Sequence, residues 1–368
     1  MQIAVNCRSI LKPRLTGIGR NTYHLLDSLG RIDQKNEYVL YCPKKLFDFK
    51  RRLPQFPYTN FTVKRDMFER GAAQIIGKHD VYHIPSPDVI PDDHPTPVVV
   101  TVHDLIYKTW PQSHTDQTID MTERLMRDIV LKADKIICTS NSTRLDLHRF
   151  FNLSEEKSCV VYNGVDHHLF YALSRDQKKH AAQMLEEKGV VGPFILSVGT
   201  LEPRKNLANT LKAMVILKEK KLFAGKLVVI GASGWMMEET EKLVEQLGLT
   251  EEVLFMGYVT DEELRYFYNV ATAFVYPSFY EGFGFPIVEA FCCGAAVVTS
   301  NVSSCPEVAG DAAMTVDPSN AEAIARALAA IVQDEGLRTA LQNKALLRAQ
   351  DFSFLKTARE TLTVYKSL

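Results

Sequence analysis

The amino-acid sequence predicts an α/β protein built of two doubly wound domains. Short apolar runs of strand length alternate with longer segments of helical periodicity along the whole chain. The alternation occurs in two separate series, and a chain of 368 residues corresponds to two domains at roughly 150 residues each. This pattern is typical of open parallel sheets with helices on both faces, rather than of one closed barrel.

The first series occupies the N-terminal half. Residues 98–102 form a nearly continuous apolar run, which indicates a parallel strand that is buried on both faces. Strands are expected at residues 3–5, 38–41, 81–84, 98–102 and 135–138. Helices are expected between them at residues 21–29 and 115–133.

The second series repeats this rhythm. Its expected strands are residues 194–198, 226–230, 253–256, 273–275 and 296–299, and its expected helices are residues 206–219, 238–247, 261–270 and 321–331. A turn signal at Asn163-Gly164 and a charged stretch at residues 174–187 separate the two series. The sequence therefore predicts an N-terminal domain of residues 1–170, a C-terminal domain of residues 171–351 and a linker near residues 166–190.

Composition and charge narrow the class of protein. Hydrophobic residues make up 46% of the chain and charged residues 24%, as in a soluble globular protein. The formal net charge is −1, so no nucleic-acid partner is expected, because dedicated nucleic-acid binders are strongly basic. No apolar run approaches the roughly 18 residues of a membrane span, and no secretion signal opens the sequence. The seven cysteines form no C-x-x-C pair, so free thiols in the cytoplasm are expected.

The first motif with chemical potential is Thr16-Gly17-Ile18-Gly19-Arg20, before a helix expected to begin near Asn21. Two glycines allow close approach of the backbone to a ligand, and the start of a helix favours an anion. The loop lacks the third glycine of a dinucleotide fingerprint and lies too far from the first strand, so it does not predict an NAD site. The alternative interpretation is a surface loop.

The second motif is His103-Asp104, directly after the strand at residues 98–102. Ligands of open parallel sheets bind at the carboxyl ends of strands, so this pair is well placed for a site. The alternative is a structural histidine. The sequence contains no G-x-S-x-G nucleophile motif, which argues against a hydrolase triad.

The third motif runs from Gly199 to Asn206 and follows the strand at residues 194–198. Arg204 and Lys205 are adjacent cations at a strand-to-helix connection, where they suit a diphosphate. Asn206 is expected to cap the next helix. A solvated charge pair is the alternative interpretation.

The fourth motif begins at Glu281 and ends in a helix that contains Glu289. Gly282 and Gly284 open the backbone before this helix, and Pro286 suits its first turn. The N–H groups at the helix start favour anionic or hydroxyl-rich ligands, and carboxylates accept from paired sugar hydroxyls. A glycosidase acid and nucleophile would also need two carboxylates, but that interpretation leaves the Arg-Lys pair unexplained.

Together these motifs resemble the retaining glycosyltransferases of family 4, which have the GT-B architecture, and the resemblance covers essentially the full chain. It is carried by the segments TGIGR (16–20), HD (103–104), EPRKN (202–206), GYV (257–259), EGFGFPIVEA (281–290), PEV (306–308) and FSF (352–354). Phe354 departs from the family pattern, in which tryptophan is common, and we expect this to affect packing alone.

The resemblance implies two Rossmann-like domains that face each other across a cleft. The C-terminal domain would bind a nucleotide-sugar donor, and the N-terminal domain would lie on the acceptor side. A helix in residues 352–368 would pack back on the N-terminal domain. No metal and no cofactor is expected, and no D-x-D pair is present to hold a metal.

The resemblance also implies roles for single residues. Arg204 and Lys205 would hold the diphosphate and stabilise the departing nucleotide. Glu281, with backbone N–H groups near Phe283 and Gly284, would hold the donor sugar.

The remaining site residues follow from the same resemblance. Glu289 would bind the ribose hydroxyls, with Gly199 and Val259 also on the donor side. His103 would contact the sugar from the opposite domain. The loop with Gly17 and Gly19 would approach donor and acceptor, and retention would proceed by front-face attack assisted by the leaving phosphate.

Within the family, the motifs most resemble bacterial mannosyltransferases that build surface polysaccharide such as lipopolysaccharide. GDP-mannose is therefore the expected donor, with UDP-glucose or UDP-N-acetylglucosamine as alternatives. A nucleotide-sugar epimerase and an inactive nucleotide-sugar-binding subunit are the less favoured functions. The acceptor is expected to be a glycan or a lipid-linked oligosaccharide.

Residues 44–70 carry eight basic and three acidic side chains, a net charge of +5. This stretch indicates either a solvated face or a patch that docks on anionic lipid, where each basic residue contributes about 1 kcal/mol. The expected location is accordingly cytoplasmic, with peripheral contact at the inner face of the plasma membrane as the second possibility.

Overall fold

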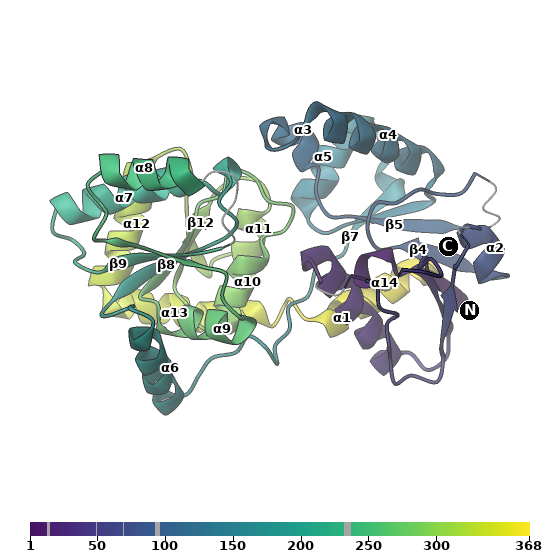
Figure 1. The fold of residues 1–368 in the computed structure, drawn as a ribbon, viewed down its shortest axis with the longest axis horizontal. Coiled ribbons are helices and arrows are strands. Elements are labelled where there is room, and N and C mark those ends of the chain that lie inside the picture. The colour runs from purple at the N-terminus through teal and green to yellow at the C-terminus, as the bar shows by residue number, and fades with distance from the viewer. Residues whose placement is uncertain (13–14, 49, 69, 93–95, 232–236) are drawn as a thin grey trace. The chain divides into compact units, whose positions relative to one another are not determined.

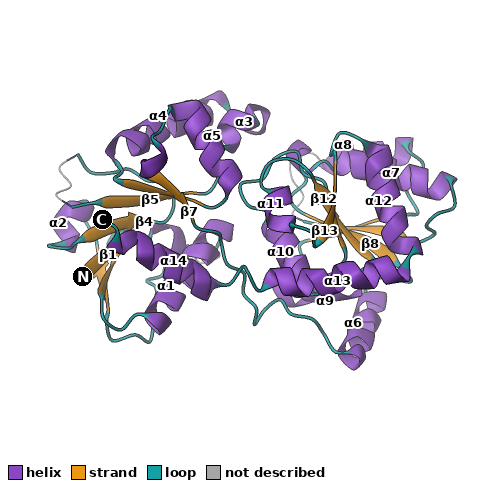
Figure 2. Cartoon of the chain, turned by 180° about the vertical axis from the view of Figure 1, so that it is seen from behind, coloured by secondary structure: helices purple, strands orange, loops and turns teal. Residues whose placement is uncertain are grey.

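The computed structural model describes residues 1–12, 15–48, 50–68, 70–92, 96–231 and 237–368. The chain forms two compact units (Figure 1). The N-terminal unit contains Met1–Gly164 together with Ser353–Leu368, and the C-terminal unit contains Val165–Phe352. Each unit is one parallel sheet flanked by helices, as Figure 2 shows for the strands in orange and the helices in purple. The predicted fold class, two doubly wound α/β domains, is confirmed.

The sheet of the N-terminal unit has seven strands in the order β3-β2-β1-β4-β5-β6-β7, and all its pairings are parallel. The strands are β1 (Gln2–Asn6), β2 (Glu37–Cys42), β3 (Phe61–Arg65), β4 (Val81–Ile84), β5 (Val98–Val102), β6 (Lys135–Cys138) and β7 (Ser158–Val160). Successive residues of β1 serve opposite faces, since Ile3 and Val5 belong to one core cluster and Ala4 to the other.

Helices cover both faces of this sheet. They are α1 (Gly17–Ile32), α2 (Ala72–Ile76), α3 (Ile106–Thr109), α4 (Asp116–Lys132), α5 (Asn141–Phe151) and α14 (Phe354–Lys366), with short 3-10 turns at η1 (Arg8–Ile10), η2 (Pro111–Ser113) and η3 (Glu155–Lys157). α1 and α14 contribute apolar side chains to the core cluster of Ile3 and Val5, whereas α2, α4 and α5 contribute to the cluster of Ala4.

Polar contacts join α14 to the rest of the N-terminal unit. Tyr365 is buried, and its hydroxyl lies 2.6 Å from Nδ1 of the buried His83 on β4. Thr357 donates to the carbonyl of Tyr162 at 2.8 Å. The last helix of the chain therefore completes the unit that the first residues begin.

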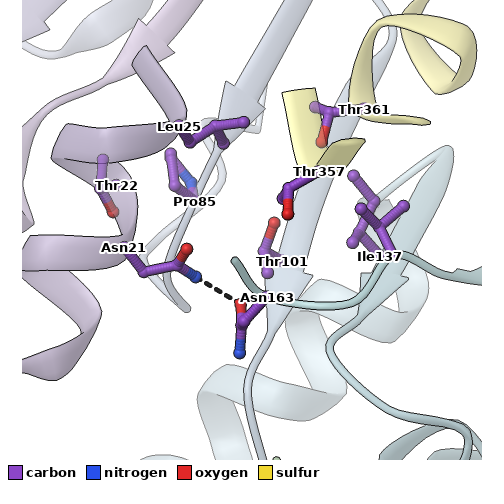
Figure 3. Close-up of a pocket in the computed structure, with 10 residues that line it drawn as sticks. Asn21, Thr22, Leu25, Pro85, Thr101, Ile137, Asn163, Thr357 and Thr361 are labelled. Atoms are coloured by element: carbon purple, nitrogen blue, oxygen red, sulfur yellow. Dashed lines mark hydrogen bonds between the residues drawn. The ribbon is translucent and has the colours of Figure 1, made fainter. Parts of the chain in front are cut away.

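A cavity of about 20 Å³, enough for one water molecule, lies in this unit between α1, α14 and the sheet (Figure 3). Asn21 of α1 donates from Nδ2 to Oδ1 of Asn163 at 2.5 Å across one side of it. The lining residues are Asn21, Thr22, Leu25, Pro85, Thr101, Ile137, Val161, Asn163, Thr357 and Thr361.

The start of α1 corrects one expectation from the sequence. The helix begins at Gly17 rather than near Asn21, so both glycines of the first motif lie in its first turn and not in a loop before it. Thr16 caps the helix, because its hydroxyl accepts from the N–H of Gly19 at 3.3 Å. Glycine is a weak helix former, which hid this turn in the sequence pattern.

The two glycines differ in their surroundings. A Cβ at position 19 would lie 2.7 Å from the carbonyl oxygen of Ser9, whereas a Cβ at position 17 would meet nothing within 4 Å. Gly19 is thus required by the packing of α1 on η1. Gly17 has no such packing requirement.

We expect Gly19→Ala to lower the free energy of unfolding by about 1–3 kcal/mol, because the backbone of η1 must shift. The matched control Gly17→Ala should leave it unchanged or raise it by up to about 1 kcal/mol, since alanine favours the helix. Urea unfolding followed by circular dichroism measures both. Equal effects of the two substitutions would contradict the packing argument.

The sheet of the C-terminal unit has six strands in the order β10-β9-β8-β11-β12-β13, again with parallel pairings throughout. The strands are β8 (Phe194–Val198), β9 (Lys226–Ile230), β10 (Val253–Gly257), β11 (Ala273–Tyr276), β12 (Val297–Ser300) and β13 (Ala313–Val316). Its helices are α6 (Arg175–Glu187), η4 (Pro203–Lys205), α7 (Leu207–Glu219), α8 (Met237–Gln246), α9 (Asp261–Val270), α10 (Phe285–Cys292), α11 (Cys305–Ala309), α12 (Ala321–Gln333) and α13 (Glu335–Ala349).

Strand β11 shows how the core of this unit is divided. Ala273 and Val275 belong to the cluster that α7 and α12 cover. Phe274 points to the other face, where its ring meets the ring of Tyr268 on α9 edge-on at 5.2 Å. Helices on both faces leave the loops at the strand ends as the exposed polar part of the sheet.

Candidate functional site

Three connections at one edge of the C-terminal sheet carry the candidate site. They follow β8, β11 and β12, which are neighbours in the sheet. Because these strands are parallel, their carboxyl ends lie at the same edge. The connection after β8 carries Arg204 and Lys205, the one after β11 carries Glu281, and the one after β12 carries Ser303 and Ser304.

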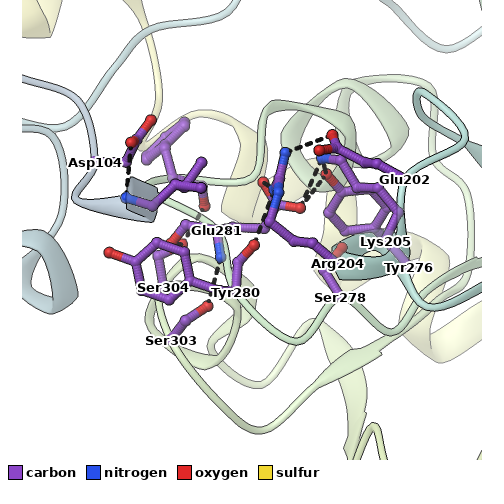
Figure 4. A network of polar contacts seen from close by, with 12 residues as sticks. Asp104, Glu202, Arg204, Lys205, Tyr276, Ser278, Tyr280, Glu281, Ser303 and Ser304 are labelled. Atoms are coloured by element: carbon purple, nitrogen blue, oxygen red, sulfur yellow. Dashed lines mark hydrogen bonds and ion pairs between the residues drawn. The ribbon is translucent and has the colours of Figure 1, made fainter. Parts of the chain in front are cut away.

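The carboxylate of Glu281 is the centre of a polar network (Figure 4). Arg204 Nη1 lies 2.9 Å from Glu281 Oε2, and Lys205 Nζ lies 2.7 Å from Glu281 Oε1. Tyr276, the last residue of β11, donates its hydroxyl to Glu281 Oε1 at 2.8 Å and accepts from Lys205 Nζ at 2.6 Å. Arg204 also bonds Glu202 Oε1 at 2.7 Å and the carbonyl of Tyr280 at 2.9 Å.

Burial strengthens these contacts. Glu281 and Arg204 are 6% and 8% exposed. Burial raises the pKa of Glu281, but Lys205 and Arg204 outweigh it and bring this pKa down to about 2. Burial opposes the charge of Arg204, yet Glu281 and Glu202 raise its pKa further. Both partners are therefore charged at neutral pH.

The backbone around Glu281 is held by two serines. The N–H of Glu281 donates to Ser303 Oγ at 3.0 Å, and Ser304 Oγ lies 2.9 Å from the carbonyl oxygens of Glu281 and Phe283, to either of which it can donate. Ser303 has a φ of +54°, an uncommon conformation for a residue with a side chain. A strained residue at this point is consistent with a functional loop.

Asn206 corrects a second expectation. It stands at the N-cap position of α7 but has a left-handed φ of +61°, and its side chain makes no capping hydrogen bond. Its amide nitrogen donates instead to the carbonyls of Pro277, at 2.9 Å, and Pro318, at 2.6 Å. Asn206 thus ties the Arg-Lys connection to the loop after β11.

The other predicted donor-side residues surround this network. Gly199 lies under the aliphatic stem of Lys205, because a Cβ there would be 3.5 Å from Lys205 Cγ and Cδ. Phe283 is buried, and its ring meets the ring of Phe352 edge-on at 5.7 Å. Gly284, with a φ of +99°, stands at the N-cap of α10. Val259 is buried just after β10.

Glu289 lies on α10, within the helix rather than in the loop of Glu281. Its side chain is half-buried, and Oε2 accepts from the hydroxyl of Tyr268 on α9 at 3.1 Å. A carboxylate held in this way keeps acceptor capacity for further hydroxyl groups.

In the N-terminal unit, His103 follows β5 as predicted and is 9% exposed. Burial lowers its pKa, so the ring is neutral at pH 7. Nε2 lies 2.8 Å from the carbonyl of Pro85, to which it must donate, so Nδ1 is the acceptor nitrogen. Asp104 Oδ1 accepts from the N–H of Ile106 at 3.1 Å and shapes the turn before α3.

The structure thus brings Arg204, Lys205 and Glu281 into direct contact, and it adds residues to which the sequence assigned no role. These are Glu202, Tyr276, Ser303 and Ser304. The position of Tyr276 at the end of an apolar strand was a usable signal. Within the described ranges, no group of three or more His, Cys, Asp or Glu side chains could hold a metal ion. No helix in that part of the chain is long and apolar enough to span a membrane.

Two family models match the chain, one in each half. Residues 15–169 match Glycosyltransferase Family 4, and residues 182–348 match Glycosyl transferases group 1. Both matches are to glycosyltransferase domains.

Individual proteins are also similar to this chain in sequence or in fold. The chain is 29% identical, over 97% of its length and 98% of the relative's, to O-antigen chain mannosyltransferase B of Escherichia coli. It resembles in fold a sucrose-phosphate synthase of Thermosynechococcus elongatus, with a TM-score of 0.78 and 20% identity over 100% of this chain and 98% of that one. It also resembles Anabaena HepE in complex with UDP and glucose, with a TM-score of 0.72 and 16% identity over 100% of both chains.

Proposed function

Because this chain belongs to the family 4 glycosyltransferases, we propose that it transfers mannose from GDP-mannose to a glycan or lipid-linked oligosaccharide with retention of the anomeric configuration. The acceptor would belong to a bacterial surface polysaccharide. The name of the Escherichia coli relative, an O-antigen chain mannosyltransferase, supports mannose as the sugar. UDP-glucose and UDP-N-acetylglucosamine are the alternative donors. The structure of HepE in complex with UDP and glucose is the reason to test UDP-sugars as well.

One observation carries this proposal: Arg204 and Lys205 contact Glu281, which lies in the buried loop before α10. Arg204 and Lys205 would contact the diphosphate and stabilise the charge that develops on it. The N–H groups of Phe283 and Gly284, with Glu281, would hold the sugar, and Glu289 would accept from the ribose hydroxyls. Gly199 and Val259 would line the donor side.

No step of this proposal calls for a metal or a cofactor. The side chains of Arg204 and Lys205 would supply the positive charge beside the leaving diphosphate. The leaving phosphate would assist the front-face attack that gives retention. His103 would act through Nδ1, which can accept from a hydroxyl, and the first turn of α1 with Gly17 and Gly19 would lie on the acceptor side.

A donor screen tests the proposed function. We expect GDP-mannose and GDP to raise the melting temperature. A ligand concentration of about a hundred times the dissociation constant should add about 2.7 kcal/mol to the free energy of unfolding. GDP-mannose should also be hydrolysed slowly without acceptor, and EDTA should change neither result. A preference for a UDP-sugar would replace the donor in this proposal, and a strict need for Mg²⁺ or Mn²⁺ would contradict the role of Arg204 and Lys205.

A lipid-linked acceptor calls for a membrane contact, and we propose that the loops after β2 and β3 make it. Phe47 and Phe68 are 79% and 64% exposed. Arg65 binds the first loop from β3, donating to the carbonyls of Lys44, Lys45 and Leu46 at 2.6–3.1 Å. Because β2 and β3 are parallel neighbours, both loops lie at one sheet edge.

Basic side chains surround these two aromatic rings. Lys45, Lys50, Arg52 and Arg70 are exposed in the same stretch, in which Glu69 lies outside the described residues. Exposed aromatic rings beside cations suit the interface of an anionic bilayer.

We expect the double variant Phe47→Ser with Phe68→Ser to bind phosphatidylglycerol-containing vesicles about tenfold more weakly than the wild type, from the loss of buried apolar area. Binding of the wild type should fall with added salt, since the basic residues contribute by charge. Co-sedimentation measures both effects. Leu131→Ser, at a residue 78% exposed on α4, is the matched control and should change nothing. Wild-type binding that equals the variant's would refute the contact.

A further inference from the structure

The two cations of the proposed diphosphate site are already paired with carboxylates of the chain itself. Glu281 contacts both, through Oε2 to Arg204 at 2.9 Å and Oε1 to Lys205 at 2.7 Å. Glu202 contacts Arg204 at 2.7 Å as well. Two positive and two negative side chains therefore balance in this cluster, and an anion that binds there meets no excess of positive charge.

Glu281 is also fixed in place more firmly than an ordinary loop carboxylate. Its backbone N–H donates to Ser303, its carbonyl oxygen lies 2.9 Å from Ser304 Oγ, and its carboxylate accepts from Tyr276. The residue is 6% exposed. The carboxylate cannot swing into solvent without breaking this set of contacts, so it stays beside the cations when a second anion arrives.

The charge of Glu281 persists under working conditions. Burial favours the neutral acid, but Lys205 and Arg204 hold its pKa at about 2. A phosphate group near Arg204 and Lys205 would therefore face an ionised carboxylate at the same two side chains, and like charges at such distances repel strongly in a buried site.

We propose that Glu281 is a fixed internal counter-ion that shares Arg204 and Lys205 with the nucleoside diphosphate and so weakens the grip of the site on the nucleotide product. This inference rests on the proposed function. It gives Glu281 a second task beside holding the donor sugar. Ser303 is the positioning residue, because its hydroxyl anchors the N–H of Glu281. Release of the product nucleotide depends on this weakening, and product release limits the turnover of many enzymes.

Calorimetric titration of the full chain with GDP, UDP and inorganic pyrophosphate tests the inference. For the ligand that the wild type binds, we expect Glu281→Gln to have a dissociation constant at least about tenfold lower than that of the wild type. The amide keeps the size of the side chain and removes its charge. Sugar transfer by the same variant should fall. A merely structural role for Glu281 would weaken binding and transfer together.

Two further variants sharpen the test. Ser303→Gly keeps every charge and suits a φ of +54°, so it should fold. It removes the hydroxyl that anchors the Glu281 backbone, and the less firmly positioned counter-ion should tighten nucleotide binding severalfold. Asp311→Asn removes one negative charge from an exposed ion pair with Lys344 and should leave binding unchanged. If Glu281→Gln does not fold, Ser303→Gly decides alone.

The outcomes separate this inference from the proposed function. A wild-type chain that binds none of the three ligands overturns both. A wild-type chain that binds at least one, with unchanged or weaker binding in the variants of Glu281 and Ser303, overturns the counter-ion alone.

Discussion

Replacing Lys205 by alanine should lower the rate of sugar transfer by about a hundredfold or more, because a cation is lost where charge develops on the leaving diphosphate. In the structure Nζ of Lys205 is held by Glu281 and by the hydroxyl of Tyr276, and it lies 5.0 Å from the centroid of the Tyr276 ring. This ammonium is therefore already oriented before any substrate arrives. Steady-state kinetics with the donor found in the screen measures the effect.

Two controls separate charge from packing at this position. Lys205→Met keeps the stem over Gly199 but removes the charge, and it should be as slow as the alanine variant. The melting temperature should change little in both, because Glu281 retains Arg204 and Tyr276 as partners. Near-wild-type turnover by purified Lys205→Met would show that the ammonium has no part in transfer.

Arg204→Ala should abolish measurable transfer and also lower the free energy of unfolding by about 3 kcal/mol, because removal of one partner leaves a buried carboxylate short of its counter-charge. Arg204 is 8% exposed, and its guanidinium joins Glu202, Glu281 and the carbonyl of Tyr280. The loss of stability distinguishes this residue from its neighbour.

Thermal unfolding of the alanine variants at positions 204 and 205, compared side by side, checks this second expectation. Arg204→Lys restores one charge but not the fork that reaches two carboxylates, so it should recover part of the stability and little of the activity. Equal melting temperatures for Arg204→Ala and the wild type would mean that the cluster is solvated rather than buried.

All the interior strands could be predicted from the sequence, together with the edge strand β10, whose residues 253–256 are all apolar. β5 and β11 are short apolar runs, because they are buried on both faces. β3, at the edge of its sheet, reads Phe-Thr-Val-Lys-Arg and is only partly buried, so its pattern resembles a loop. β7 and β13 are also edge strands with incomplete burial, and neither was predicted.

The candidate site divides in a similar way. Arg204, Lys205 and Glu281 were assigned to one site through the family resemblance, and the structure brings them into contact at one edge of a parallel sheet. The roles of Ser303 and Ser304 depend on the exact path of the loop after β12, which no periodicity encodes. The sequence predicted that Asn206 caps α7, because asparagine favours the N-cap position. In the structure its side-chain amide donates instead to the carbonyls of Pro277 and Pro318, which lie far away in the sequence.

The discontinuity of the N-terminal unit has a consequence for how the protein is made. Residues 353–368 belong to that unit, yet the ribosome delivers them after the whole of Val165–Phe352. The N-terminal unit can therefore be completed only after Val165–Phe352 has been synthesised, when α14 covers α1 and Tyr365 reaches His83. Without α14 the apolar side chains of α1 that it covers are exposed, so we expect a nascent chain stalled before residue 353 to hold a complete C-terminal unit and an aggregation-prone N-terminal one.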